Sequence, residues 1–140
     1  MTKLAIASDH GGFALKEKIM QRFADVDWLD LGTGSEESVD YPQFGKAMGE
    51  AITNEDADTG ILICGSGIGI SIAANRFPAV RAALCVNAEM AALSRQHNDA
   101  NVISLGARII DEETAYECVE AFLNTEFEGG RHERRVEQLS

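Results

Sequence analysis

The sequence predicts an α/β fold in which a five-stranded parallel sheet carries helices on both faces. Five short apolar stretches alternate along the 140-residue chain with amphipathic segments of helical periodicity. Glycines stand where a strand would turn into a helix, and no repeat or linker interrupts the alternation. We therefore expect one domain, residues 1–140, with a three-layer, Rossmann-like arrangement.

Each predicted strand is a short apolar run of the kind that is buried on both faces of a parallel sheet. No small-residue cleavage site follows the first run, so it is interpreted as a strand and not as a signal peptide. The five strands are predicted at residues 4–8, 28–31, 61–64, 80–86 and 102–105.

The first two predicted helices are amphipathic. Leu15, Ile19 and Phe23 recur at intervals of four, behind a Gly11-Gly12 turn, and so share one helical face. The second helix follows Pro42. Its inward residues are predicted to be Phe44, Met48, Ala51 and Ile52.

Three more helices are predicted in the second half of the chain. Residues 68–75 form a short helix, Met90 and Leu93 mark a helix that ends near Asn98, and Asp111 is the N-cap of a longer one. The residues of this last helix that are expected to face inward are Ala115, Val119, Phe122 and Leu123.

Composition and charge exclude several classes of protein. The net charge is −11, so the surface repels nucleic acids and anionic membranes. Only 6% of the residues are aromatic, which leaves little to stack on bases. No apolar run approaches the ~20 residues that span a bilayer. Three cysteines without a CxxC pair fit a reducing cytoplasm better than secretion.

The most informative segment is the run Cys64-Gly65-Ser66-Gly67-Ile68-Gly69 after the third predicted strand. Alternating glycines let backbone N–H groups converge on one point, and the helix that follows adds the positive end of its dipole. Such a run suits a phosphate or a transient oxyanion. It lacks the Lys-Ser/Thr pair of a P-loop and the third glycine of a dinucleotide fingerprint. A plain tight turn is the alternative.

Cys64 stands where this strand meets the loop, whereas Cys85 and Cys118 lie inside predicted elements and are interpreted as core residues. A helix N-terminus stabilises a thiolate, so Cys64 could act as a nucleophile or a general base. The alternative is a small buried side chain. A phosphatase would need an arginine to close a Cys-x5-Arg loop, and Ile70 stands at that position.

Other polar groups lie at the ends of elements. Asp9-His10 follows the first strand, and His97 belongs to a polar run that closes a helix. In this acidic protein, three of the twelve basic residues fall in the C-terminal run 129–135. Arg131 and Arg135, four apart, would point the same way on a helix and suit an anion. A capping Asp, a solvated His and a solvated tail are the alternatives.

Five runs in this order resemble the B-type ribose-5-phosphate isomerases, whose wider family includes the allose-6-phosphate and galactose-6-phosphate isomerases. The resemblance covers essentially the whole chain. The runs are ASDHGG at 7–12, DYP at 40–42, CGSGIG at 64–69, SRQHNDAN at 94–101 and EGGRH at 128–132.

The resemblance implies an aldose–ketose isomerase that interconverts ribose 5-phosphate and ribulose 5-phosphate through an enediolate. It implies that Cys64 is the proton-abstracting base and that His97 opens the sugar ring, with Ser66 and Asp9 also at the catalytic centre. Some relatives use a nearby glutamate as the base, but this chain has Ile70 and Ser71 there. The implied substrate contacts are Asp9, His10, Tyr41, Gly65, Ser66, Gly67, Ile68, Gly69 and Asn98. The implied phosphate contacts are His10, Arg108, Arg131, His132 and Arg135.

The resemblance also implies a homodimer or a dimer of dimers with sites built across the dimer interface. The C-terminal helical segment, about residues 126–140, is expected to pack on a neighbouring subunit. The implied partner is a small sugar phosphate, with no nucleic acid, membrane, cofactor or metal. The sequence leaves open a hexose 6-phosphate of the allose or galactose type, and also a module that binds a sugar phosphate without chemistry.

Overall fold

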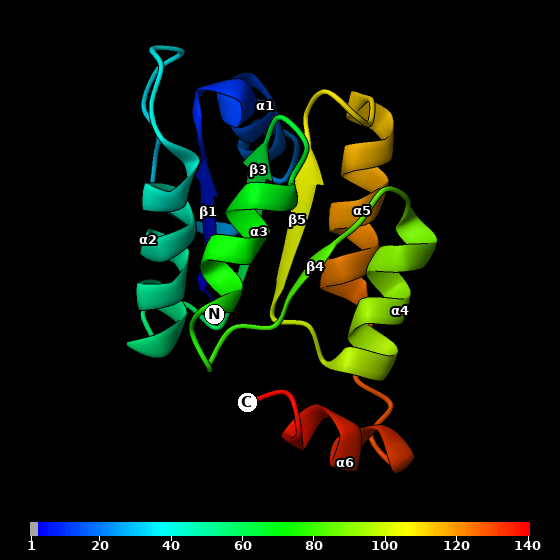
Figure 1. Ribbon diagram of the computed structural model, residues 1–140. Helices are drawn as coiled ribbons and strands as arrows, with labels where there is room; N and C mark the ends of the chain where they lie inside the picture. The colour runs from blue at the N-terminus through cyan, green and yellow to red at the C-terminus, as the bar shows by residue number, and fades with distance from the viewer. Residues whose placement is uncertain (1–2) are drawn as a thin grey trace.

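The computed structural model describes residues 3–140 and contains a five-stranded parallel sheet (Figure 1). Its spatial order is β2-β1-β3-β5-β4, and every neighbouring pair is parallel. The predicted fold class is confirmed. The chain continues from β1 to β2 on one side of β1, and then crosses to β3 on the other side of β1. The strand order therefore reverses between β1 and β3, and folds of this kind bind ligands beyond the carboxyl ends of the strands at such a switch point. The strands are β1 (Lys3–Ser8), β2 (Asp27–Asp30), β3 (Thr59–Cys64), β4 (Ala82–Leu84) and β5 (Val102–Gly106).

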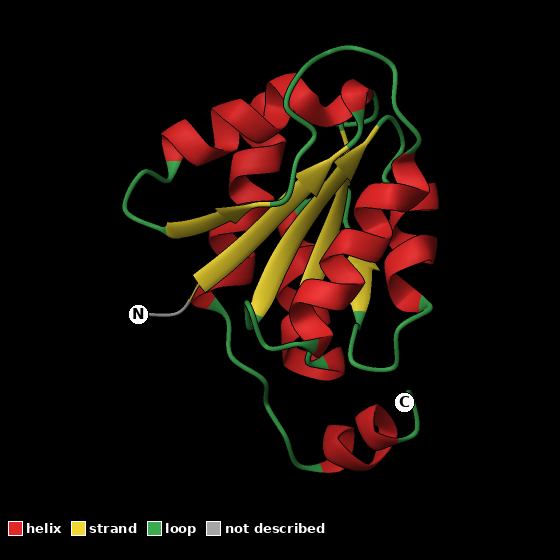
Figure 2. Cartoon of the chain, turned by 90° about the vertical axis from the view of Figure 1, so that its left-hand side faces the viewer, coloured by secondary structure: helices red, strands yellow, loops and turns green. Residues whose placement is uncertain are grey.

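Helices cover both faces of the sheet (Figure 2). One face carries α1 (Phe13–Arg22), α4 (Ala88–Asn98) and α5 (Glu112–Asn124), and the other carries α2 (Tyr41–Thr53) and α3 (Ile68–Asn75). A short 3-10 helix, η1 (His10–Gly12), joins β1 to α1. The last helix, α6 (Arg131–Glu137), lies outside both layers, beyond the end of α4. Within residues 3–140, each helix is too short or too polar to cross a bilayer.

Alternate residues of the central strands feed two apolar cores. Ile61 and Ile63 of β3 pack with α1 and α5, whereas Leu62 and Cys64 pack with α2 and α3. Cys85 and Cys118 are buried in the first of these cores, as the sequence predicts. Burial raises the pKa of the Cys85 thiol to about 12 and that of the Cys118 thiol to about 11.

The fourth strand is shorter than the predicted 80–86. β4 forms the edge of the sheet, and the Asn75 side chain occupies its outer side. The Asn75 amide donates to the Ala82 carbonyl at 3.0 Å, and its oxygen accepts from the Ala82 N–H at 2.8 Å. Backbone hydrogen bonds to β5 continue on either side, at Arg81 and Cys85.

The expectation that Leu123 faces inward is wrong, since this side chain is 39% exposed. Helix α5 buries Ala115, Cys118, Val119 and Phe122. These residues follow the spacing of one helical face, and Leu123 lies a further 100° around the helix from Phe122.

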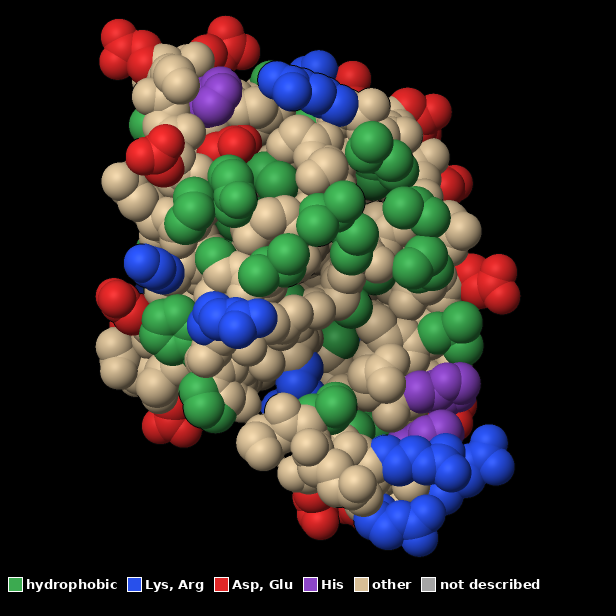
Figure 3. Space-filling model, viewed as in Figure 1, with side chains coloured by type: hydrophobic (Ala, Val, Ile, Leu, Met, Phe, Trp, Pro, Cys, Tyr) green, Lys and Arg blue, Asp and Glu red, His purple; other side chains and the backbone are tan. Residues whose placement is uncertain are grey.

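One face of the molecule leaves large apolar side chains in contact with solvent. Figure 3 shows them over α3, β4 and α4. Contiguous exposed apolar surface of this kind marks an interaction site in soluble proteins. We call it the apolar face; its residues are Tyr41, Ile68, Ile72, Val86, Met90, Leu93 and Ile109.

Candidate active site

The thiol of Cys64 is held by the loop that follows β3. Cys64 is the last residue of this strand and only 4% exposed, and the Gly67 N–H donates to its Sγ at 3.1 Å. Gly67 has φ +80°, and a Cβ there would lie 2.7 Å from the Leu84 side chain and 2.9 Å from the Leu105 backbone. Only glycine lets the chain turn in this way. The turn directs a backbone donor at the sulfur.

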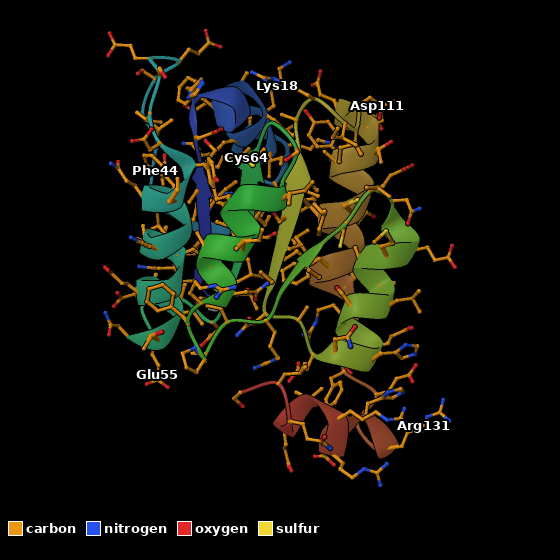
Figure 4. The ribbon with its side chains drawn as sticks, viewed as in Figure 1. Lys18, Phe44, Glu55, Cys64, Asp111 and Arg131 are labelled. Atoms are coloured by element: carbon orange, nitrogen blue, oxygen red, sulfur yellow. The ribbon has the colours of Figure 1, made fainter. Side chains whose placement is uncertain are left out.

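The loop borders an open cavity of about 570 Å³ at the carboxyl ends of the strands. Figure 4 shows Cys64 at this end of the sheet. Gly69 lies so close to the Tyr41 ring that a Cβ would approach it to 2.4 Å, and Arg108 lies over Gly65. The structure therefore brings together most of the residues predicted to contact the sugar. The cavity is lined by Asp9, Tyr41, Cys64, Gly65, Ser66, Ile68, Gly69, Ile72, Arg108 and Ile109.

Asp9 and His10 have different environments. The Asp9 carboxylate accepts from the Gly12 N–H at 3.2 Å and caps η1. A Cβ on Gly11 would lie 3.3 Å from this carboxylate and 3.6 Å from the Gly65 nitrogen, so Asp9 borders the loop. His10 Nδ1 accepts from the Val39 N–H at 3.2 Å. The proton of a neutral His10 is then on Nε2, which remains a donor.

Four of the other predicted residues form a second group. His97, Asn98, His132 and Arg135 border a cavity of about 240 Å³, together with Val136 and Leu139. We call these four residues the histidine–arginine cluster. His97 lies in the last turn of α4 and His132 in the first turn of α6, and their rings stack with centroids 4.4 Å apart at an interplanar angle of 16°.

The surroundings of His132 favour its neutral form. Desolvation lowers the pKa of His132, and the neighbouring His97 and Arg131 lower it further, against the opposing effect of Glu128. Arg131 itself begins α6 and is exposed. Figure 3 shows histidines gathered beside the basic side chains of this helix.

The two groups lie at opposite ends of the sheet. Cys64 is level with Gly106 at the carboxyl end of β5, whereas α4 runs back along the sheet and ends beside the amino end of β5 at Val102 (Figure 1). Four strand residues at about 3.3 Å each put about 13 Å between these levels. A single chain therefore does not bring Cys64 and His97 into one site.

Some site residues were missed in the sequence. Ile72 and Ile109 line the Cys64 cavity although they are apolar, and their exposure is evident only once the packing is known. The carboxylate of Glu128 lies 3.9 Å from His97 Nε2 and 3.7 Å from His132 Nε2. Its place in the run 128–132 was a signal, but nothing in the sequence indicated which side chains it meets.

The fold and the site define a class: a parallel α/β protein with a thiol on a glycine-rich loop at the switch point of its sheet. Comparison with known proteins identifies the family within this class. The family model described as Ribose/Galactose Isomerase matches residues 4–139. The chain belongs to this family.

Individual relatives are similar to this chain over nearly their full length. Ribose-5-phosphate isomerase B of Escherichia coli is 45% identical over 142 residues, which cover 100% of this chain and 95% of the relative. A ribose 5-phosphate isomerase structure from Thermotoga maritima has a TM-score of 0.95 and 50% identity, with coverages of 99% and 97%. Ribose-5-phosphate isomerase B of Mycoplasma genitalium, solved with bound ribulose-5-phosphate, has a TM-score of 0.90 and 40% identity, with coverages of 98% and 93%.

Proposed function

We propose that this chain is an aldose–ketose isomerase that interconverts ribose 5-phosphate and ribulose 5-phosphate. The names of its full-length relatives support the reaction and the substrate. The observation that carries the proposal is the Cys64 thiol, held by the Gly67 N–H at the edge of a cavity large enough for a small sugar phosphate.

The arrangement around Cys64 suits proton transfer between two adjacent carbons. Isomerisation through an enediolate needs a base at the C1–C2 bond, and the Cys64 thiolate is that base. It also needs donors for the developing oxyanion. The N–H groups of Gly65 and Ser66 form no hydrogen bond within residues 3–140, so both are free to donate to it. Asp9 and Tyr41 border the same cavity and contact the sugar.

The histidine–arginine cluster supplies ring opening and part of the phosphate binding. Ribose 5-phosphate arrives as a closed ring, and His97, with its side chain 41% exposed, opens it as an acid–base group. Asn98 binds the sugar beside it. Arg131, His132 and Arg135 bind the phosphate from this end, and His10 and Arg108 bind it from the Cys64 end. Phosphate binding positions the reacting carbons, because it adds binding energy remote from the chemistry.

These two halves meet when two chains pair. A general acid or base must lie within about 3 Å of the proton it transfers, and about 13 Å separates the levels of Cys64 and His97 in one chain. In a two-fold dimer, His97 and α6 of one copy reach the Cys64 cavity of the other, and the reverse contact makes a second site. The apolar face adjoins the cavity, through Tyr41, Ile68, Ile72 and Ile109, and is the surface that pairing would bury. We therefore include a homodimer, or a dimer of dimers, in the proposal.

The proposed role is metabolic and cytoplasmic. Ribose 5-phosphate and ribulose 5-phosphate are interconverted in pentose phosphate metabolism, and three free cysteines suit a reducing compartment.

Formation of ribulose 5-phosphate from ribose 5-phosphate tests the function directly. The parent should be active, and Cys64→Ser should be folded, bind substrate and lose several orders of magnitude in kcat, because a serine hydroxyl is a poor base. Allose 6-phosphate and galactose 6-phosphate, tested alongside, should give a lower kcat/KM than the pentose. Sugar-phosphate binding without turnover would instead indicate a binding module.

A further inference from the structure

We propose that His97, Glu128 and His132 form a binding site for a divalent transition-metal ion such as Zn²⁺, and that its occupancy inhibits the enzyme. The inhibitory part rests on the proposed role of His97 in opening the sugar ring. The site itself rests only on the positions of the three side chains.

The three potential ligand atoms lie close together. His97 Nε2 and His132 Nε2 lie 3.9 Å and 3.7 Å from the same oxygen, Oε1 of Glu128, and the three ligand atoms all lie within 4.8 Å of one another. Tetrahedral Zn²⁺, with ligand bonds of about 2.0–2.2 Å, needs neighbouring ligand atoms about 3.3 Å apart. The two distances to Glu128 would have to shorten by about 0.4–0.6 Å. Because the imidazole rings stack at an interplanar angle of 16°, the more exposed His97 ring would also have to turn until its Nε2 lone pair points at the ion. At the present distances the carboxylate is too far for a direct hydrogen bond to either ring.

Backbone and side-chain contacts hold these ligands in place across two elements. The Glu128 N–H donates to the Gln96 carbonyl in the last turn of α4 at 3.1 Å. The Arg95 side chain donates to the Thr125 carbonyl, also at 3.1 Å. The chain between α5 and α6 is thus fixed against the helix that carries His97. His132 follows Glu128 by four residues, across the two glycines that precede α6, and its side chain is only 11% exposed. Pre-positioned ligands lower the cost of ordering a metal site.

The chemistry of the ligands selects the ion. Two imidazoles and one carboxylate suit Zn²⁺, Co²⁺ or Ni²⁺, whereas Mg²⁺ and Ca²⁺ prefer oxygen ligands. Arg131 and Arg135 lie on the same helix as His132 and oppose any cation through charge alone. Binding must therefore depend on coordination by nitrogen. The exposed side of His97 and Glu128 leaves a fourth position for water.

Metal occupancy would block the reaction by using the nitrogen that the reaction needs. His97 Nε2 bound to Zn²⁺ has no lone pair with which to accept a proton, and carries no proton to donate. The proposed ring opening would stop, while the Cys64 thiol on the same chain would be unaffected. The ion is therefore an inhibitor of the enzyme and not a cofactor.

Isothermal titration of chelator-treated protein with ZnCl₂ tests the site without reference to activity. We expect one ion per chain for the parent and none with MgCl₂. Glu128→Gln, at an exposed residue, should weaken Zn²⁺ binding at least tenfold, and His132→Asn should weaken it further. Glu126→Gln makes the same charge change two residues away, at another exposed position, and should bind as the parent does. Cys64→Ser should also keep the stoichiometry. Unchanged binding in Glu128→Gln, or lost binding in Cys64→Ser, would overturn the site.

Isomerase assays with added Zn²⁺ test the inhibition. The same concentration should inhibit the parent and Glu126→Gln, and Glu128→Gln should need at least tenfold more. If Zn²⁺ binds through Glu128 but activity persists in the saturated protein, the inhibitory part of the proposal is wrong. Absence of activity in the metal-free parent would instead overturn the proposed function, and would leave the titration result standing.

Discussion

Two inactive variants of this chain should restore activity when they are combined. Cys64→Ser removes the proposed base and His97→Asn removes the proposed ring-opening group, so each homodimer should be inactive on ribose 5-phosphate. In a mixed dimer, one site receives the intact Cys64 of one chain and the intact His97 of the other. The second site receives both substitutions.

The size of the effect follows from the separation of the two residues. Because Cys64 and His97 lie at opposite ends of the sheet, at levels about 13 Å apart, each site must take them from different chains. Random exchange of an equal mixture makes about half of the dimers mixed, and one site in two is intact in these, so about a quarter of the parental activity should return. Sites built within one chain would return none, since every mixed dimer would carry one substitution in each site.

The assay is ribulose 5-phosphate formation after the two variants have been mixed under mild denaturant, to exchange subunits, and then returned to buffer. Light scattering checks that dimers have reformed, and each variant treated alone gives the baseline. An exchanged mixture with no more activity than this baseline would refute the two-chain site. Full activity of a monomeric parent would do the same.

Three further predictions concern phosphate binding, packing and pH. Arg135→Ala should raise the KM for ribose 5-phosphate by a factor that corresponds to about 1–3 kcal/mol of binding energy, but should change the poor turnover of unphosphorylated ribose far less. Equal losses on both substrates would exclude phosphate recognition by Arg135. Gly106→Ala would place a Cβ 2.5 Å from the backbone carbonyl oxygen of Ser66 and should lower the free energy of unfolding in urea by about 1–3 kcal/mol, whereas Gly34→Ala, with no atom within 4 Å, should stay within about 0.5 kcal/mol of the parent. Between pH 9 and 12 the buried Cys85 thiol stays protonated in the folded state and ionises in the unfolded state. Ionisation of Cys85 should therefore lower the free energy of unfolding by about 1.4 kcal/mol per pH unit in this range. Urea titrations at pH 8 and 10 should find that Cys85→Val lacks this contribution of Cys85 to the loss of stability.

The sheet and the Cys64 loop could be predicted because their signals are local. A buried parallel strand is a short apolar run, and a loop that turns at a positive φ needs glycine at a particular position, here Gly67. Element ends were less certain. β4 covers only Ala82–Leu84 of the predicted 80–86, and the apolar stripe of α5 excludes Leu123.

The division of the proposed site residues between the two ends of the sheet could also have been predicted from topology. A helix that joins two parallel strands runs back along the sheet, so a residue at its end lies at the edge opposite the strands' carboxyl ends. His97 closes such a helix. The meeting of Glu128 with His97 and His132 depends instead on the path of the chain after α5, and no pattern in the sequence indicates that path.

The side chain of Asn75 has a consequence for how copies of this protein can associate. An uncovered strand edge invites another chain to add in register, and growth of that kind has no natural end. Here both outward-facing backbone groups of Ala82, the first residue of β4, are already bonded to one amide, so a strand that added in register would find this position occupied. Loss of that amide, as in Asn75→Ala, would reopen the edge as a route to open-ended aggregation. The native chain thus carries its broad apolar surface beside a strand edge whose first residue is already capped.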